Sequence, residues 1–457
     1  MEDRINNIAG KKVAFLTLGC KVNSYETEAM QQLFVAAGAE VKAFTEKADI
    51  YVVNTCTVTN IADRKSRQML HKAKHMNSEA VVVAVGCYAQ ASKEDLENDD
   101  TIDIVIGNNR KKDIITIVNE YYNDRTSISV VDIENEDEYE DLKIETVAEK
   151  TRAYIKIQDG CNQFCSYCII PYARGRIRSR KAEEVVAEVE RLVANGYKEV
   201  VLTGIHLSSY GLEKKSVLEQ SNLKTKDGSN PLLDLIVALC KIDGLERIRF
   251  GSLEPRIITD EFVKTLSESP KVCPHFHLSL QSGAKDTLKR MNRKYTPDEY
   301  YEKCEIIRKY YDHPAITTDV IVGFPGETEE EFKETKTFLR KVSFAQMHVF
   351  KYSKRKGTTA EAMKDQVNDP VKAARSEELI ALEEQMRNEY RDQLIGTEAI
   401  VLAEEEMEID GITYMTGHTE RYVRVAFLGD ASLAGSLVNV RILKQLNKEM
   451  MLSEIID

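Results

Sequence analysis

Short apolar runs alternate with amphipathic stretches along the first part of the chain. The apolar runs cover residues 13–16, 50–53, 81–85 and 102–106, and the stretches of helical period cover residues 27–37, 62–75, 91–98 and 112–123. Such alternation is typical of βαβ units, whose strands lie parallel in one sheet. We therefore expect an α/β protein whose N-terminal domain, residues 11–131, is an open parallel sheet covered by helices.

A second alternation of strands and helices follows an acidic segment. The many carboxylates between residues 132 and 150 predict a solvated linker or edge segment without a catalytic role. Beyond it, strand-like runs lie at residues 153–157, 199–203, 247–251, 275–280, 315–322 and 344–350. This number of βα units is too small for an eight-stranded barrel, so it predicts a partial (β/α)6 barrel over residues 151–388, with the chemistry at the carboxyl ends of the strands.

The last part of the chain has a different pattern. A charged helical stretch at residues 373–394 leads to short alternating strands at residues 400–402, 422–427 and 437–442, with glycines between them. Several short strands of this kind indicate a small antiparallel β-barrel, which we place at residues 389–457.

Composition and charge narrow the class of protein. The chain has 457 residues, a formal net charge of −12 and nine cysteines. The negative charge excludes a globally basic nucleic-acid binder, so any RNA contact must come from local patches. An odd number of cysteines, without a charged-then-apolar leader after Met1, disfavours a secreted disulfide framework. No apolar run approaches the about 20 residues that span a bilayer. We expect a cytoplasmic protein without a membrane partner.

Three cysteines lie close together after the first predicted barrel strand. Cys161, Cys165 and Cys168 have a Cys-x3-Cys-x2-Cys spacing. Cysteine thiolates hold iron-sulfur clusters, and three ligands leave one iron of a four-iron cluster open to a small molecule with amino and carboxylate groups. A zinc knuckle or a set of buried thiols is the alternative. Zinc would want a fourth Cys or His, and none lies close in sequence.

A second cysteine triad is spread over the N-terminal domain. Cys20, Cys56 and Cys87 each follow an apolar run. Because the carboxyl ends of parallel strands share one edge of a sheet, these thiols should meet there. They could instead be ordinary buried thiols, but we interpret them as the ligands of a second iron-sulfur cluster. The remaining cysteines are most simply core or surface thiols: Cys240, Cys273 and Cys304.

The spacing of the first triad resembles the signature of the radical S-adenosylmethionine (SAM) superfamily. With the second triad and the terminal barrel, the whole chain resembles the methylthiotransferase family of these enzymes, which implies that the barrel is a TRAM domain. Residues 18–28 and 171–180 resemble the branch that acts on N6-threonylcarbamoyladenosine at tRNA position 37, next to the anticodon. Lys21-Val22-Asn23 fits neither the Gly-Cys-Gln-Met-Asn segment of the isopentenyladenosine branch nor the Gly-Cys-Pro-Lys-Asn segment of the branch that modifies a ribosomal-protein Asp.

The resemblance implies two [4Fe-4S] clusters and SAM as cofactors. One SAM would methylate a sulfur held at the Cys20, Cys56 and Cys87 cluster, and a second would be cleaved at the other cluster to a radical that activates carbon 2 of the adenine. Cofactors carry this chemistry, so no side chain beyond the cluster ligands is assigned as catalytic. The implied partners are tRNA and an electron donor such as a flavodoxin or ferredoxin, while the sulfur source stays open.

Other functions fit parts of this pattern. A methylthiotransferase acting on isopentenyladenosine or on a ribosomal-protein Asp would keep both clusters. A two-cluster electron carrier would need no SAM, and an RNA-binding protein with structural clusters would release no modified nucleoside.

Residues near predicted strand ends are candidates for SAM contacts. By resemblance, Tyr167 lies near the adenine, and Gly204 offers a backbone contact at the end of a strand. Polar groups and glycines leaving later strands could bind the ribose or the methionyl part, and Arg180 could pair with the carboxylate. For Glu327, a contact to the ligand and an ordinary role in a turn explain the sequence equally well. The full set is Tyr167, Arg180, Gly204, Glu254, Gln281, Ser282 and Gly323.

Basic residues supply the local signal for RNA. They crowd the segment after the first cysteine triad and recur after later strands and in the terminal barrel, where they could neutralise phosphates. Those near the cluster could also pair with the carboxylate of a threonylcarbamoyl group. A run of charges more often only solvates a surface. The RNA candidates are Arg174, Arg176, Arg178, Lys354, Arg355, Arg421 and Arg424.

Overall fold

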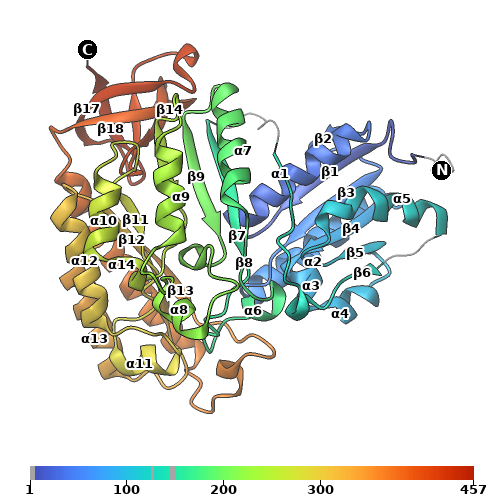
Figure 1. The fold of residues 1–457 in the computed structure, drawn as a ribbon, viewed down its shortest axis with the longest axis horizontal. Helices are drawn as coiled ribbons and strands as arrows, with labels where there is room; N and C mark the ends of the chain where they lie inside the picture. Colours follow the sequence, from blue (N-terminus) through green and yellow to red (C-terminus); the bar gives the residue numbers. More distant parts are fainter. Residues whose placement is uncertain (1–5, 125–127, 145–150, 457) are drawn as a thin grey trace.

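The protein has three units that pack on one another. The structure is a computed structural model that describes residues 6–124, 128–144 and 151–456. Figure 1 shows the N-terminal sheet on the right, the larger barrel on the left, and the small C-terminal barrel above it. None of the described helices combines the length and apolarity needed to cross a membrane.

The N-terminal unit is the expected open parallel sheet. In the described chain it has six strands in the order β2-β1-β3-β4-β5-β6, every pair parallel. The strands are β1 (Lys12–Thr17), β2 (Glu40–Lys42), β3 (Ile50–Thr55), β4 (Val81–Gly86), β5 (Ile104–Ile106) and β6 (Ile128–Ser129). The helices are α1 (Lys21–Ala36), α2 (Asn60–Met76), α3 (Cys87–Ala91), α4 (Lys93–Glu97) and α5 (Ile114–Asp124), with a short 3-10 turn η1 (Lys111–Asp113).

Both faces of this sheet are buried, which explains its unbroken apolar runs. Val83 and Val85 of β4 pack with α1 and α5 on one face. Val82 and Ala84 pack with α2 on the other. Since successive strand residues point to opposite faces, each apolar run supplies two separate cores.

The acidic segment differs from the predicted solvated linker. Its apolar residues Ile133, Leu142 and Ile144 are buried, and so is Glu140. The Tyr25 hydroxyl of α1 donates to the Leu142 carbonyl at 2.7 Å. The segment therefore packs between the N-terminal sheet and the barrel, because its apolar residues seek the interface while most of its carboxylates stay outside. Residues 145–150 of the predicted linker lie outside the described residues.

The central unit is a partial barrel with six main strands, as expected. They form two sheets, β10-β9-β7-β8 and β11-β12-β13, and the bridges Ile248–Val272 and Leu253–Leu278 lie between these sheets. The strands are β7 (Arg152–Asp159), β9 (Glu199–Gly204), β10 (Arg247–Phe250), β11 (His275–His277), β12 (Ala315–Val322) and β13 (Gln346–Lys351), with a short antiparallel β8 (Arg178–Ser179) beside β7.

Helices and 3-10 turns surround this barrel. They are α6 (Ile170–Ala173), α7 (Ala182–Ala194), η3 (Leu207–Ser209), α8 (Val217–Asn222), α9 (Pro231–Cys240), η4 (Pro255–Ile257), α10 (Asp260–Ser267), α11 (Lys285–Arg290), α12 (Pro297–Tyr310), α13 (Glu329–Val342), η5 (Thr359–Ala362) and α14 (Asp369–Asp392).

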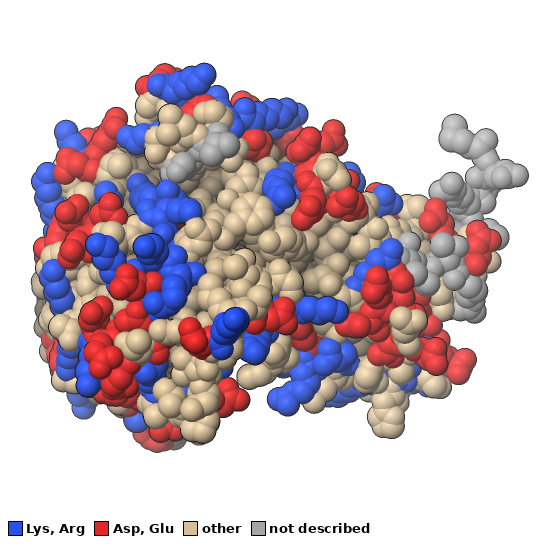
Figure 2. Space-filling view, turned by 90° about the horizontal axis from the view of Figure 1, so that it is seen from below, with Lys and Arg blue, Asp and Glu red and all other residues tan. Residues whose placement is uncertain are grey.

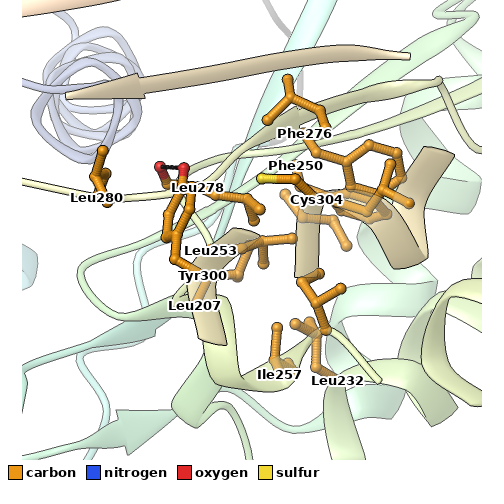
Figure 3. Close-up of a cluster of buried hydrophobic side chains, with 14 of the residues drawn as sticks. Leu207, Leu232, Phe250, Leu253, Ile257, Phe276, Leu278, Leu280, Tyr300 and Cys304 are labelled. Carbon is orange, nitrogen blue, oxygen red and sulfur yellow. Dashed lines mark hydrogen bonds between the residues drawn. The ribbon is translucent and has the colours of Figure 1, made fainter. Parts of the chain in front are cut away.

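The hydrophobic core of the barrel lies between its strands and these helices. Phe250, Phe276 and Leu278 gather there, and Figure 3 shows Cys304 of α12 among them. The Tyr300 hydroxyl donates to the Leu278 carbonyl at 2.9 Å, so a polar atom in this apolar cluster has a partner. Cys304 is thus a core thiol, as expected.

The C-terminal unit is a closed five-stranded barrel, β14-β15-β16-β18-β17, which confirms the predicted small barrel. Its β16–β18 pair is parallel, whereas the expected barrel was antiparallel throughout. The elements are β14 (Glu398–Ile409), β15 (Ile412–Thr419), β16 (Arg424–Phe427), η6 (Ala431–Leu433), β17 (Leu437–Gln445) and β18 (Met451–Ile455). Tyr422 joins this barrel to the central one: its ring lies 4.6 Å from that of His418 and 5.1 Å from that of His275.

Candidate iron-sulfur sites

The structure brings Cys20, Cys56 and Cys87 to one edge of the N-terminal sheet. They follow β1, β3 and β4, which are adjacent strands, so they are neighbours despite their separation in sequence. A Cβ on Gly19 would lie 3.0 Å from the Cys56 sulfur, which shows how closely these loops approach. Burial raises the pKa of Cys56 to about 11, and the neighbouring Cys87 and Cys20 thiols add to this rise. Cys20 is exposed, so the triad opens to solvent on one side.

A buried arginine from the barrel reaches this triad. Arg174, directly after α6, is fully buried. Its Nε lies 3.1 Å from the Cys87 sulfur. Its terminal nitrogens contact Glu26 at 2.9 and 3.1 Å and Asp159 at 3.1 Å. Burial opposes ionisation of Glu26, but Arg174 and two lysines outweigh it and hold its pKa below the usual range.

Cys161, Cys165 and Cys168 lie on the loop after β7. Cys161 is buried, and the other two are half-buried. The Cys168 N–H donates to the Cys165 carbonyl at 3.0 Å, so the loop turns sharply between them. Arg293 places a terminal nitrogen 3.4 Å from the Cys165 sulfur. Burial raises the pKa of Cys168 to about 12, with Cys165 adding to it.

Gly160 is required where this loop leaves the strand. Its φ is +70°, a conformation that L side chains rarely adopt, and an added Cβ would lie 1.7 Å from the Arg176 carbonyl oxygen. Only glycine permits this approach. This close approach places Cys161 against the segment that carries Arg174 and Arg176.

Both triads fit a polynuclear cluster by the chemistry of their donors. Each offers three thiols, the ligand type of iron-sulfur clusters. Each also has a guanidinium beside one sulfur, which offsets the negative charge of ligated thiolates. Among the described residues, no three His, Cys, Asp or Glu side chains surround one metal-ion position. A cubane cluster needs no such convergence, because each thiolate binds its own iron.

The residues expected to contact SAM lie at or near the carboxyl ends of the barrel strands, and several already have partners. Ser282 is buried, with its hydroxyl 3.2 Å from that of Thr335. Glu254 binds Arg256 at 2.8 Å. The Gly323 N–H donates to the Glu327 carboxylate at 2.9 Å, so the turn explanation of Glu327 accounts for what it does.

The remaining candidates for SAM contacts could bind through an accessible ring or through the backbone. The Tyr167 ring is half-buried and meets Phe324 edge-on at 6.3 Å. Gly204 lies beside Gln158, and Gln281 has a φ of +73°.

Arg180 already has a carboxylate partner inside the protein, which argues against its expected pairing with the SAM carboxylate. It is buried and pairs with Glu188 at 2.6 Å. This pairing could not be read from the sequence, because α7 brings Glu188 back against the strand only in the folded barrel.

Three of the arginines predicted to contact RNA are also occupied inside the protein. Arg174 is bound as described above. Arg178 is buried and donates to the carbonyls of Arg174 and Glu136 at 2.9 and 3.3 Å. Arg355 is buried and binds Asp63 of the N-terminal unit at 2.7 Å. These positions argue against phosphate contacts, because each guanidinium is buried and already binds protein oxygens.

The arginines of the small barrel also have protein partners. Arg421 donates to the carbonyls of His313 and Asp312 at 3.1 Å each, which ties the small barrel to the large one. Arg424 binds Glu405 at 3.0 Å and stays half-buried.

Arg176 and Lys354 also keep accessible surface. Arg176 is half-buried and lies over the Phe164 ring, 4.7 Å from its centroid. Phe164 and Tyr172 are 37% and 41% exposed, with their rings 6.1 Å apart. Lys354 is exposed. Figure 2 shows uncharged residues across the middle of the face seen from below, with both basic and acidic side chains around them.

The sequence did not identify His206 and Arg293 as candidate site residues. Arg293 lies against the Cys165 sulfur, far along the chain from the cysteine loop. His206 is half-buried, and its Nε2 has no hydrogen-bond partner among the described residues. Burial, with Arg293 and Arg256, lowers the pKa of His206 to about 3, so the ring is neutral. Its place just beyond Gly204, at the end of a barrel strand, was the available signal.

Two family profiles match the chain. They are the Radical SAM superfamily, over residues 155–339, and the Uncharacterized protein family UPF0004, over residues 12–107.

Curated proteins resemble the chain over nearly its full length. It is 43% identical to threonylcarbamoyladenosine tRNA methylthiotransferase MtaB of Bacillus subtilis, with 94% of each chain covered. It is 36% identical to MtaB of Thermotoga maritima, covering 97% of this chain and 96% of that one. It is 35% identical to tRNA-2-methylthio-N(6)-dimethylallyladenosine synthase of Finegoldia magna, covering 97% and 94%.

Among solved structures, the fold resembles radical S-adenosylmethionine methyltransferase TsrM of Kitasatospora setae. The TM-score is 0.54 at 15% identity, with 88% of this chain and 79% of that chain covered.

Proposed function

This chain belongs to the radical SAM methylthiotransferase family, and we propose that it converts N6-threonylcarbamoyladenosine at tRNA position 37 to its 2-methylthio derivative. The observation that carries the proposal is the 43% identity to the Bacillus subtilis enzyme named for that nucleoside, over 94% of both chains. The two thiol triads, one on each side of the interface between the N-terminal sheet and the barrel, support it.

We propose that each triad holds one [4Fe-4S] cluster. When bound, the cluster at Cys161, Cys165 and Cys168 supplies, with SAM, the radical that can take hydrogen from an unactivated ring carbon, and the second cluster holds sulfur. The protein contributes placement. Gly160, Arg174 and Arg293 fix the cysteine loops through backbone conformation and contacts to sulfur. An electron donor such as a flavodoxin or ferredoxin is required from outside the chain.

Neutral His206 is proposed as a cofactor contact. Its Nδ1 is engaged by the Ser209 hydroxyl, which leaves Nε2 as the polar atom for a ligand. Tyr167, Gly204 and Gln281 remain proposed SAM contacts on the same side of the barrel.

Arg176, with Phe164 and Tyr172, is proposed to contact the RNA beside the reacting base. Exposed aromatic rings and a guanidinium plane are what unstacked bases pack against. Arg176 can also meet the threonylcarbamoyl carboxylate, for which burial makes Arg174 and Arg178 unsuitable. Lys354 supplies a phosphate contact of the sequence-independent kind.

The test is turnover on defined RNAs. Reconstituted enzyme, SAM, dithionite and a sulfide source are incubated anaerobically with one tRNA carrying adenosine, isopentenyladenosine or N6-threonylcarbamoyladenosine, and nucleosides are measured by mass spectrometry. We expect 2-methylthio product on the last RNA and far slower reaction on the others, because a site built around a polar group rejects substrates that lack it.

Each other result has a distinct meaning. Reaction only on isopentenyladenosine would move the chain to the branch of the Finegoldia magna relative, which is 35% identical. Modification of a ribosomal-protein Asp instead of any tRNA would overturn the RNA assignment. Absence of both methylthio product and 5′-deoxyadenosine in fully iron-loaded protein would remove the radical SAM activity itself.

A further inference from the structure

We propose that Arg174, supplied by the barrel, is a positioning residue for the N-terminal thiol triad and tunes the reduction potential of the cluster bound there. The inference rests on the proposed second cluster. It adds that the barrel unit, through one side chain, completes a site whose ligands all come from the N-terminal unit.

The first observation is a direct contact to sulfur. Arg174 Nε lies 3.1 Å from the Cys87 sulfur, within reach of an N–H···S hydrogen bond. Asn108 Nδ2 lies 3.7 Å from the same sulfur and donates to the Ala173 carbonyl at 2.7 Å, next to Arg174 in the chain. The Cys87 sulfur is therefore held by donors at the contact between the two units.

The second observation is that Arg174 also reaches the other two cysteine loops through one amide. Its Nη2 donates to Asn23 Oδ1 at 2.7 Å. The Asn23 amide nitrogen donates to the carbonyls of Leu18 at 2.7 Å and Thr55 at 3.1 Å, which lie just before Cys20 and Cys56. All of these groups are buried. One guanidinium thus sets the geometry of the whole triad.

The third observation ties Arg174 to the other triad. Its Nη1 meets Asp159 at 3.1 Å, and Asp159 accepts the Gly160 N–H at 2.8 Å, directly before Cys161. The Cys161 N–H donates to the Gly175 carbonyl at 3.0 Å, directly after Arg174. A continuous set of buried hydrogen bonds therefore connects the two cysteine sites.

The chemical consequence concerns the N-terminal cluster. Hydrogen bonds to ligand sulfur, and charge near it, are among the features that set cluster potentials. A donor and a fixed positive charge both stabilise the more negative, reduced state. Losing Arg174 should therefore make the midpoint potential of that cluster more negative, and losing only the N–H···S geometry should do so less.

The experiment isolates one cluster. In a full-length variant with Cys161, Cys165 and Cys168 replaced by Ala, iron content and the potential of the remaining cluster are measured by an anaerobic EPR-monitored redox titration. Arg174→Lys and Arg174→Gln are then introduced. Lys keeps the charge but not the fork of donors. We expect the potential to fall in the order Arg, Lys, Gln, with the far-ultraviolet circular dichroism spectrum unchanged.

Arg180→Lys and Arg180→Gln are the matched controls. Arg180 is also buried and paired with a carboxylate, Glu188, and within the described part of the chain its guanidinium makes no hydrogen bond to a cysteine sulfur. These variants should leave the potential unchanged. If Arg174→Gln does not fold, the Lys variant alone carries the test.

The outcomes separate the two proposals. If the variant that lacks Cys161, Cys165 and Cys168 binds no iron, the proposal of a second cluster at the N-terminal triad is wrong, and so is the function proposed for that triad. Iron retained with a potential that is the same for Arg, Lys and Gln at position 174, or that shifts equally in the Arg180 variants, would overturn the role of Arg174 while leaving the clusters in place.

Discussion

Replacing Glu26 by Gln should destabilise the junction between the N-terminal sheet and the barrel, and it should lower the free energy of unfolding more than most single substitutions do. The carboxylate is fully buried and lies 2.7 Å from Lys156, 2.9 Å from Arg174 and 3.2 Å from Lys111. Gln keeps the shape and removes the charge. Asp159 and Glu140 then remain as the carboxylates near these three buried cations.

The magnitude follows from the cost of an unpaired buried charge. Breaking a buried ion pair by removing one partner costs about 3–5 kcal/mol. For a unit of roughly 150–250 residues, each kcal/mol shifts the melting temperature by about 2–4 °C, so we expect a fall of roughly 6–20 °C. A Glu26→Gln/Lys111→Met double variant should lose less than the sum of the single changes, because it removes one of the stranded cations.

The assay is anaerobic thermal unfolding at pH 7.5, followed by circular dichroism. The matched control is Glu40→Gln, which removes an exposed carboxylate paired with Lys42 and should leave the transition in place. An equal shift for Glu26→Gln and Glu40→Gln would refute the reasoning, and so would strict additivity in the double variant.

The pH dependence has a defined sign. The cations hold the pKa of Glu26 below its ordinary value near 4.5, against the effect of burial. A carboxyl whose folded pKa is depressed contributes its full stabilisation above the ordinary pKa and loses it as pH falls toward the folded value. The difference in unfolding free energy between wild type and Glu26→Gln should therefore be largest at pH 7 and should decrease progressively below about pH 4.5.

Three further results are expected. Reconstituted protein should bind about eight irons, and removing Cys161, Cys165 and Cys168 together should remove about half, whereas Cys240→Ala should remove none; full iron in the triple variant would contradict two clusters. Tyr422→Ala should weaken docking of the small barrel by roughly 1–3 kcal/mol, seen as faster hydrogen exchange on both sides of that interface and not elsewhere. His206, with its pKa lowered to about 3, should make the protein less stable as pH falls below about 6.5, by about 1.4 kcal/mol per pH unit, and His206→Gln should flatten that slope in melting experiments.

The strands and the cysteine sites were readable from the sequence because their signals are local. The apolar runs predicted the β3, β4 and β12 strands closely, since a strand buried on both faces needs a nearly continuous apolar stretch. The placement of Cys20, Cys56 and Cys87 after such runs was sufficient to predict their meeting at one sheet edge, because parallel strands end on the same side.

The partners of the buried charges were decided only by the tertiary structure. Arg174, Arg178, Arg180 and Arg355 read as solvent-facing or ligand-binding cations, yet all four are buried. Arg174 meets Glu26, which lies 148 residues away in sequence. A charge is stable inside a protein only where folding brings a complementary group within hydrogen-bond distance.

The sequence by itself therefore determined the fold class and the placement of the cysteines after the strands, because hydrophobic period and residue type act over a few residues. Only the tertiary structure decided that the acidic segment packs into an interface, that the basic segment after Cys168 turns inward, and that exposed Phe164 and Tyr172 lie beside Arg176. The first two outcomes depend on how the N-terminal sheet and the central barrel pack together, and the third depends on how the segment after β7 folds. No local pattern of apolar and polar residues encodes these side-chain contacts.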